Sequence, residues 1–196
     1  KLKQIGRNVL NIPGWKTDRK IVVIESDDWG SIRMASREAY NFFLSRGYPV
    51  NQCPYNKFDS LESDNDIEVL LNTLSKFKDN QGNYPIVTAN YVTANPDFEK
   101  IEQSNFRLYF YEPFTNTYKR YPNHAKAFAI TNEGVNRRLI KPQFHGREHL
   151  NVTRWMIALQ EHDKDACLAF SKGMFSVHTT SKQGNIMEYM DSLNYN

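Results

Sequence analysis

Hydrophobic and polar positions along this chain follow two periods, one typical of strands and the other typical of helices. Residues 20–26, KIVVIES, contain a continuous apolar run of strand length, which predicts a strand buried on both faces. Other segments with strand patterns are YPIVTANYV (84–92), FRLYFYEPF (106–114), IKPQFHG (140–146) and MFSVHTT (174–180).

Helical spacing appears between these strand segments. The positions that recur at helical spacing in the first helix are Ile32, Ala35, Ala39, Tyr40, Phe43 and Leu44, with Gly47 as a stop signal. A second helix is expected over residues 67–77, with Asn65 and Glu68 as its capping box. Later helices are expected in residues 123–139, in residues 151–163 with Asn151 as the cap, and in residues 163–172.

Strands separated by helices predict an α/β fold with a mostly parallel sheet and crossover helices. No internal repeat or linker divides residues 1–196, so we expect one domain. In such sheets the chemistry lies at the carboxyl ends of the strands.

Composition and charge exclude some classes of protein. The net charge is only +3 and the basic residues are scattered, which argues against a nucleic-acid partner. The sequence contains no apolar run long enough to span a bilayer and no signal peptide, and it leaves both a cytoplasmic and an exported location open. Cys53 and Cys167 lack metal-ligand spacing and are expected to be ordinary thiols rather than a disulfide.

Two adjacent acids, Asp27 and Asp28, follow the first predicted strand directly. One interpretation is that one of them caps the next helix, since Asp favours that position. The other is that one carboxylate binds a metal, which relieves the repulsion between the two acids, while its neighbour acts as a base.

His145 and His149 follow the strand predicted over residues 140–146. Two unrelated polar histidines in a loop are one interpretation of this pair. The functional interpretation is a metal site of two imidazoles and one carboxylate, which leaves a position open for water. The same HGREH segment fits the His-x-x-Glu-His motif of the inverted zinc proteases, with Glu148 as the base. That motif requires a continuous helix, which Pro142 and Gly146 disfavour.

Together, ESDDWG (25–30) and HGREH (145–149) resemble two motifs of the polysaccharide deacetylase family, whose members share the NodB homology domain. The first motif is Thr-Phe-Asp-Asp-Gly at the end of the first strand, and the second is His-Ser/Thr-x-x-His after a later strand. YPIVTANYV lies where the second strand of the family would run. The family's later Arg-x-Pro, Asp/Trp and Leu-x-His motifs are not found before Asn196, and His178 does not match the histidine of the last one. The resemblance therefore implies a partial, distorted (β/α) barrel, the N-terminal part of a longer one.

The resemblance also implies an activity, a cofactor and site residues. The activity is metal-dependent hydrolysis of acetyl groups, N- or O-linked, on a polysaccharide or oligosaccharide. Asp27 matches the catalytic base, while Asp28, His145 and His149 match the ligands of a divalent metal, zinc by ligand type, with cobalt or another first-row metal as alternatives.

The neighbouring residues suggest further roles around the site. Arg147 or Arg33 would orient Asp27, and Trp29 and Tyr91 would stack on sugar rings, with Arg147 also contacting substrate. The alternative interpretations are surface ion pairs for Arg33 and Arg147 and core positions for Trp29 and Tyr91. A non-catalytic carbohydrate-binding or structural barrel with a relict site is the competing class of protein. Oligomeric state is not predicted.

Overall fold

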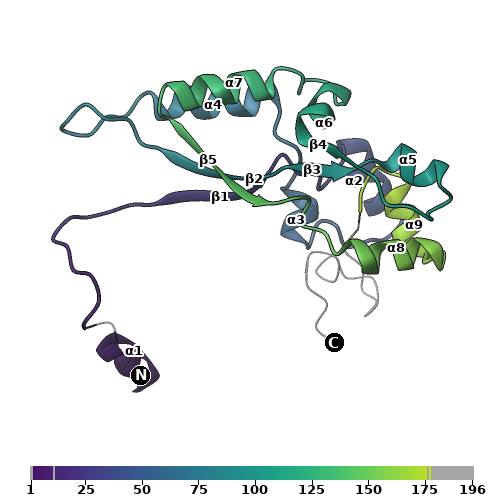
Figure 1. The fold of residues 1–196 in the computed structure, drawn as a ribbon, viewed down its shortest axis with the longest axis horizontal. Coiled ribbons are helices and arrows are strands. Elements are labelled where there is room, and N and C mark those ends of the chain that lie inside the picture. Colours follow the sequence, from purple (N-terminus) through teal and green to yellow (C-terminus); the bar gives the residue numbers. More distant parts are fainter. Residues whose placement is uncertain (1, 11, 176, 178–196) are drawn as a thin grey trace.

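The computed structural model describes residues 2–10, 12–175 and 177, and Figure 1 shows its fold. Its main sheet has three parallel strands in the order β1-β2-β5, namely β1 (Ile24–Trp29), β2 (Val87–Val92) and β5 (Ile140–Gly146). A second, two-stranded antiparallel sheet joins β3 (Ala94–Pro96) and β4 (Tyr111–Pro113). These elements confirm the mixed α/β class with parallel strands. The barrel itself stays a prediction.

The helices lie mostly on one face of the main sheet and beyond the carboxyl ends of its strands (Figure 1). The helices of the described residues are α1 (Leu2–Leu10), α2 (Arg37–Ser45), α3 (Pro54–Lys57), α4 (Asp64–Leu74), α5 (Phe98–Gln103), α6 (Phe114–Arg120), α7 (Ala127–Asn136), α8 (Val152–Gln160) and α9 (Lys164–Phe170). In Figure 1, α4 and α7 lie together on one face of the main sheet, while α2, α5, α8 and α9 gather beyond the carboxyl ends of its strands. The elements that follow the strands therefore surround the edge where a site was expected.

Local capping explains where several helices begin. The Ser36 side chain accepts a hydrogen bond from the Ala39 amide at the start of α2, and the Asn151 side chain accepts one from the Arg154 amide at the start of α8. The cap predicted at Asn151 is confirmed. The capping box predicted at Asn65 and Glu68 is wrong, because α4 begins earlier and uses Ser63 and Asp66 instead.

Helix α7 packs closely on both α4 and β5. A Cβ atom at Gly134 would lie 2.7 Å from Leu71 Cδ2 and 3.1 Å from Ile140 Cδ1, which is too close for an ordinary contact. The core beneath these helices includes Ile67 and Ala89, both almost fully buried. Gly134 lowers helix propensity, but it allows the close approach that closes this core.

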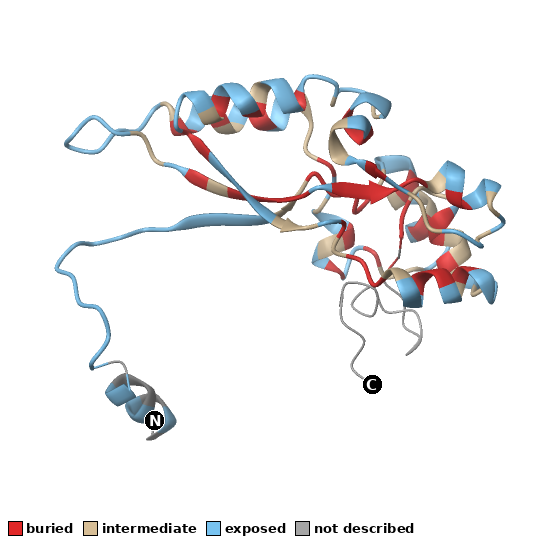
Figure 2. Ribbon diagram, viewed as in Figure 1, coloured by how far each residue is buried: buried red, intermediate tan, exposed pale blue. Residues whose placement is uncertain are grey.

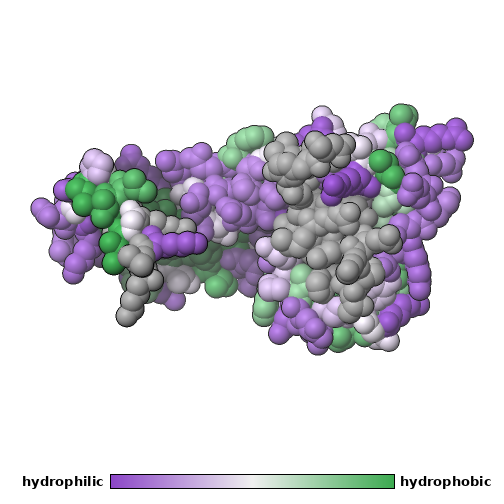
Figure 3. Space-filling view, turned by 90° about the horizontal axis from the view of Figure 1, so that it is seen from below, coloured by the Kyte–Doolittle hydropathy of each residue, from purple (hydrophilic) through white to green (hydrophobic). Residues whose placement is uncertain are grey.

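The first strand predicted over residues 20–26 forms only from Ile24 onward, and the prediction that both of its faces are buried is wrong. Strand β1 begins at Ile24, and Val22 and Val23 before it are 84% and 72% exposed. The physical reason is that β1 is an edge strand: among the described strands it pairs with β2 alone, whose first residue Val87 pairs with Ile24. Figure 2 shows this arm and most of β1 as exposed, and Figure 3 shows hydrophobic side chains gathered at the end of the molecule that holds α1.

Two other strand predictions are only partly realised. In residues 106–114 the strand is limited to β4. The start of the segment is instead a turn after α5, in which Phe106 has a left-handed backbone with φ of 60° and the Arg107 amide donates to the Ser104 carbonyl. Met174, Phe175 and Val177 are buried but not in a strand, and the rest of MFSVHTT, including His178, lies outside the described residues.

The sheet face opposite α4 and α7 carries polar side chains. Val87, Ala89 and Tyr91 point toward the core under the helices, so Asn90 and its register partner Gln143 point the other way. Gln143 is exposed.

Cys53 and Cys167 are both free thiols, as predicted. Over the described part of the chain, none of the helices has the length and apolar character needed to cross a membrane.

Candidate metal centre

The end of β1 is irregular, and this irregularity places its two acids. The register between β1 and β2 shifts between Ser26 and Trp29, and Asp28 has a left-handed backbone with φ of 65°. A bulge of this kind breaks the alternation of side chains along a strand. Asp27 and Asp28 consequently line the same small cavity, of about 200 Å³.

Arg33 holds one oxygen of Asp28. Its Nη2 atom donates to Asp28 Oδ2 at 2.6 Å, and the Arg33 side chain is almost completely buried. The interpretation of Asp27 or Asp28 as the cap of the next helix is wrong, since Ser36 caps α2. Asp28 Oδ1 is buried and accepts no hydrogen bond from any residue that the structure describes. The carboxylate is therefore fixed through one oxygen and has the other available for a ligand.

His145 and His149 complete the cluster from the end of β5 and the loop after it. His145 Nε2 lies 3.6 Å from Asp28 Oδ1, and the two imidazole rings stack with centroids 5.2 Å apart and planes 14° apart. One ligand atom from each of Asp28, His145 and His149 lies within 4.8 Å of the other two. All three residues are half-buried. The structure thus brings the three predicted ligands together.

The loop that carries the histidines is anchored to the segment after β2. The Thr93 amide donates to the Gly146 carbonyl at 3.1 Å, and the Ala94 amide donates to the Arg147 carbonyl at 2.7 Å. Gly146 has φ of 126°, a conformation that L side chains rarely adopt. His149 also has a left-handed backbone, with φ of 53°. These contacts and conformations turn both imidazoles toward Asp28.

The three residues fit a divalent metal by two tests. Two imidazoles and a carboxylate form a common donor set for zinc, and ligand atoms around a tetrahedral zinc lie about 3.3 Å apart, close to the observed 3.6 Å. Asp28 Oδ1 and His149 Nδ1 are both buried without a hydrogen-bond partner among the described residues. Such orphaned polar atoms are costly unless something binds them.

Asp27 is held by an amide rather than by an arginine. Asn90 Nδ2 donates to Asp27 Oδ1 at 2.5 Å and to Glu25 Oε1 at 3.0 Å. The prediction that Arg33 or Arg147 orients Asp27 is wrong, because Arg33 binds Asp28 and Arg147 binds Glu148. Asn90 could not be identified as a site residue from the sequence, because a single Asn inside an apolar strand belongs to no motif. Only the strand register places it beside Asp27.

The inverted-protease interpretation fails on local structure. His145 belongs to a strand and α8 begins only at Val152, so the motif does not lie in a continuous helix. Glu148 is buried and forms a two-pronged ion pair with Arg147, whose Nη2 is 2.6 Å from Glu148 Oε1. Burial, with the Glu148 charge adding to it, raises the pKa of Tyr109. Glu148 is thus part of a neighbouring ion pair rather than of the metal cluster.

The aromatic residues expected at the substrate site lie largely in the core. Tyr91 is 8% exposed, its hydroxyl lies 3.3 Å from Thr131 Oγ1, and its ring packs against Phe114. Trp29 packs against Tyr91, with ring centroids 5.6 Å apart, and is half-buried. Tyr91 therefore has no free ring face for a sugar. Trp29 still lines the small cavity, while Arg147 stacks on Tyr111 at 4.6 Å from its ring centroid.

The loop of residues 58–62 supplies two further acids, which the sequence analysis did not identify. Asp59 and Glu62 line the same cavity as Asp27 and Asp28. Burial raises the pKa of Asp59, and the charge of Asp28 raises it further while Arg33 opposes the rise. Burial also raises the pKa of Glu62, although hydrogen bonds from Tyr118 and the Gly30 amide act in the opposite direction. Both acids come from a polar loop with no distinguishing spacing.

Comparison of the chain with protein-family models, with curated proteins and with solved structures gives no match. The fold and the site by themselves define a mixed α/β protein with an Asp/His/His cluster able to hold a metal ion.

Proposed function

We propose that this protein is a metal-dependent hydrolase that removes acetyl groups, N- or O-linked, from a polysaccharide or oligosaccharide. The observation that carries the proposal is the convergence of Asp28, His145 and His149 at the carboxyl ends of β1 and β5. Parallel α/β sheets keep their active sites at this edge. The acetylated glycan as substrate is what the resemblance of ESDDWG and HGREH to the polysaccharide deacetylases implies.

Asp28, His145 and His149 would hold the metal, with zinc favoured by the donor types and cobalt or another first-row metal as alternatives. A metal bound in this position would polarise the acyl carbonyl of the substrate and would lower the pKa of a bound water. Arg33 keeps Asp28 in one orientation through Oδ2, as residues behind a metal ligand commonly do.

Asp27 is the group placed to take a proton from the attacking water. It lines the same cavity as Asp28, it is exposed, and Asn90 holds its Oδ1 atom. Water adds to the acyl carbon as Asp27 takes its proton. The bond from that carbon to nitrogen or oxygen then breaks, the proton passes to the departing nitrogen or oxygen, and acetate and the free amine or alcohol of the sugar are released. A general base in such a position contributes about 10²- to 10⁴-fold to the rate.

The test measures metal content and acetate release together. Wild-type protein is expected to bind about one metal ion per chain, and Asp28→Ala and His149→Ala are expected to lose it. Asp27→Asn is expected to keep the metal and to lose most of the acetate release. His162→Asn is the matched control, because His162 is exposed, lies outside the cluster and has φ of 58°, which Asn tolerates. Acetate release from an acetylated xylan and from chitin hexamers would then be measured for each variant.

Three outcomes decide between the classes. Acetate release that depends on the metal and on Asp27 supports the hydrolase. Full metal retention in Asp28→Ala would contradict the ligand set. Glycan binding by a chain that takes up no zinc or cobalt would favour the alternative, a carbohydrate-binding barrel without catalysis.

A further inference from the structure

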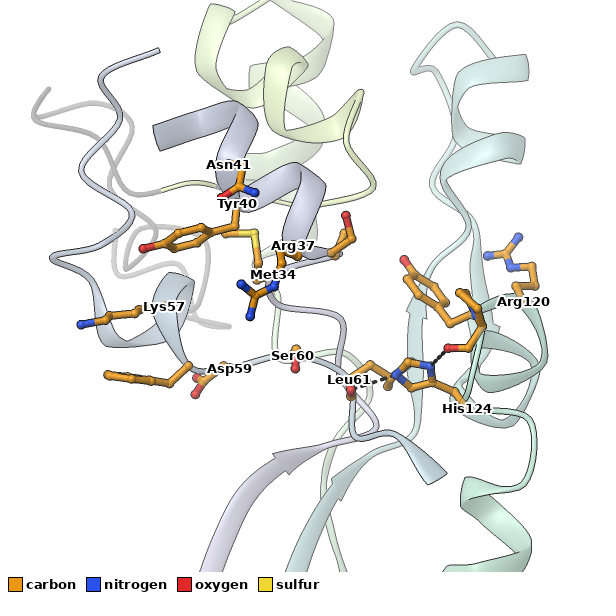
Figure 4. A pocket seen from close by; sticks show the side chains of 15 residues that line it. Met34, Arg37, Tyr40, Asn41, Lys57, Asp59, Ser60, Leu61, Arg120 and His124 are labelled. Carbon is orange, nitrogen blue, oxygen red and sulfur yellow. Dashed lines mark hydrogen bonds between the residues drawn. The ribbon is translucent and has the colours of Figure 1, made fainter. Parts of the chain in front are cut away.

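A larger cavity, of about 750 Å³, opens beside the metal centre. Figure 4 shows its lining: Met34, Arg37 and Tyr40 lie on one side, Arg120 and His124 lie on the other, and Ser60 and Leu61 lie between them. The walls come from the start of α2, from the segment after α3 and from the segment after α6. Binding sites for small molecules commonly have volumes in the range of about 300 to 1,000 Å³.

The two cavities adjoin. Phe58, Asp59 and Ser60 line both the large cavity and the small one that holds Asp27 and Asp28. A chain-like ligand that reaches the acids at the end of β1 can thus continue past Asp59 into the larger space. The large cavity lies where the units of a polymer next to the reacting unit would be.

Aromatic side chains give the larger cavity flat apolar surfaces. Phe58 is 72% exposed, and Tyr40 and Tyr121 are half-buried. Tyrosine combines an apolar ring with a hydroxyl, which suits a ligand that has both apolar faces and polar edges. Burial raises the pKa of Tyr121, so its hydroxyl stays a proton donor at neutral pH. Sugar rings have this combination of faces and edges.

The charges of the lining favour an anion. Arg37, Lys57 and Arg120 are its cations, and Asp59 is its acid. Arg120 is already paired with Glu112 at 2.5 Å. Arg37 and Lys57 are exposed and form no ion pair with any described residue. Lys57 lies over the Phe58 ring, 5.0 Å from its centroid, and both residues line this cavity.

His124 directs both of its ring nitrogens at backbone carbonyls. Its Nδ1 lies 2.6 Å from the Pro122 carbonyl and its Nε2 lies 3.1 Å from the Leu61 carbonyl, as the dashed lines in Figure 4 mark. Both ring nitrogens are thus occupied by the backbone. Among the described residues, Arg37 and Lys57 are thus the cations of this lining that form no ion pair.

The geometry points to a subsite for an acidic glycan: the sugar units beside the reacting one lie against Tyr40, Phe58 and Tyr121, and separate carboxylate or sulfate groups of these units bind Arg37 and Lys57. The assignment of a glycan rests on the proposed hydrolase function, whereas the preference for an anion rests on the unpaired cations. The substrate class is accordingly an acetylated polysaccharide that carries acidic groups.

Binding is tested by calorimetry with three tetrasaccharides: tetragalacturonate, which carries carboxylates, a heparin-derived tetrasaccharide, which carries sulfates, and neutral cellotetraose. Wild-type protein is expected to bind at least one acidic probe about tenfold more tightly than cellotetraose. Arg37→Ala and Lys57→Ala are each expected to weaken that binding by about five- to tenfold, as for the loss of one charge-assisted hydrogen bond. Lys76→Ala, which removes an exposed lysine outside both cavities, is the matched control and should leave affinity unchanged.

Comparing the affinities of the two acidic probes shows whether the site prefers a carboxylate or a sulfate. Equal affinity for the acidic probes and cellotetraose, or unchanged affinity in both Arg37→Ala and Lys57→Ala, would overturn the inference. The same titrations, set beside the metal content and acetate release of wild-type protein, separate the two proposals. A preference for an acidic probe in wild-type protein that takes up no metal and releases no acetate would contradict the hydrolase and leave the subsite, whereas metal-dependent acetate release without that preference would contradict the subsite alone.

Discussion

The Nε2 atom of His145 lies 3.6 Å from Oδ1 of Asp28, although the two residues end the two outer strands of the sheet. Strand β2 lies between those strands, so the contact spans it at the carboxyl edge. The left-handed backbone of Asp28 and the bulge at the end of β1 allow this convergence. The relationship is the basis of the proposed metal centre.

Arg33 is expected to set the metal affinity without binding the metal. In Arg33→Ala, Asp28 Oδ2 loses its partner in a half-buried site, so we expect metal affinity to fall by about 10- to 100-fold. Removing one partner of a buried ion pair also lowers the free energy of unfolding, here by about 3 kcal/mol. Titration with a chelator-buffered metal and urea unfolding measure the two effects. Arg137→Ala, at an exposed ion pair with Glu133, is the control and should change neither.

Asn90 is expected to contribute to catalysis by holding the carboxylate of Asp27 in position. In Asn90→Ala, Asp27 Oδ1 loses its hydrogen bond, and we expect kcat to fall by about tenfold or more, in keeping with the contribution of a positioned base. Metal content should stay at the wild-type level, because Asn90 does not contact the ligands. Gln143→Ala, at the register partner on β5, provides the control. Loss of metal in Asn90→Ala would show a structural role instead.

Gly134 is expected to be intolerant of a methyl group. The Cβ of Gly134→Ala would lie 2.7 Å from Leu71 Cδ2, so overpacking should lower the free energy of unfolding by about 1–3 kcal/mol. Gly6→Ala is the matched control, because Gly6 is also inside a helix but has nothing within 4 Å of its Cβ position. Denaturant titrations compare the two. Equal stabilities would mean that α7 shifts without cost.

Glu62 is expected to make stability decrease as pH rises. Its pKa is raised in the folded state by burial, so above the ordinary glutamate pKa of 4.5 the unfolded chain loses this proton before the folded chain does. The folded state then binds more protons, and the free energy of unfolding falls with pH from about 4.5 up to the raised pKa, by at most about 1.4 kcal/mol per pH unit. Urea unfolding between pH 4 and 8 should show this slope, and Glu62→Gln should reduce it. An unchanged slope in Glu62→Gln would assign it to other groups such as Asp59, whose pKa is also raised.

The exposed apolar arm before β1 is expected to bind hydrophobic probes. Val22 and Val23 are 84% and 72% exposed, and exposed apolar patches bind dyes and other apolar surfaces. Replacing both with lysine should lower the fluorescence of bound anilinonaphthalene sulfonate while the far-ultraviolet circular dichroism is retained. The matched control replaces Phe77, which is 61% exposed on the loop after α4, with lysine. A larger loss of fluorescence in that control would place the dye site elsewhere.

Local sequence was enough where one element alone sets the outcome. The apolar spacing of residues 151–163 and the polar side chain of Asn151 predicted α8 and its cap, because capping needs only neighbouring backbone amides. The acids at the end of β1 and the histidines at the end of β5 were found for a similar reason. Parallel strands separated by helices align their carboxyl ends, so residues that follow such strands meet at one edge.

The sequence by itself determined the alternation of strands and helices and the candidate ligands Asp28, His145 and His149, since these follow from periodicity and residue type. Only the tertiary structure decided which partner each charged group takes. Arg33 binds Asp28, Asn90 binds Asp27, and Arg147 binds Glu148, because a strand register and a bulge set distances that no local pattern encodes. The exposure of residues 20–23 was likewise a tertiary matter, because burial depends on which elements cover a strand and not on how apolar the strand is.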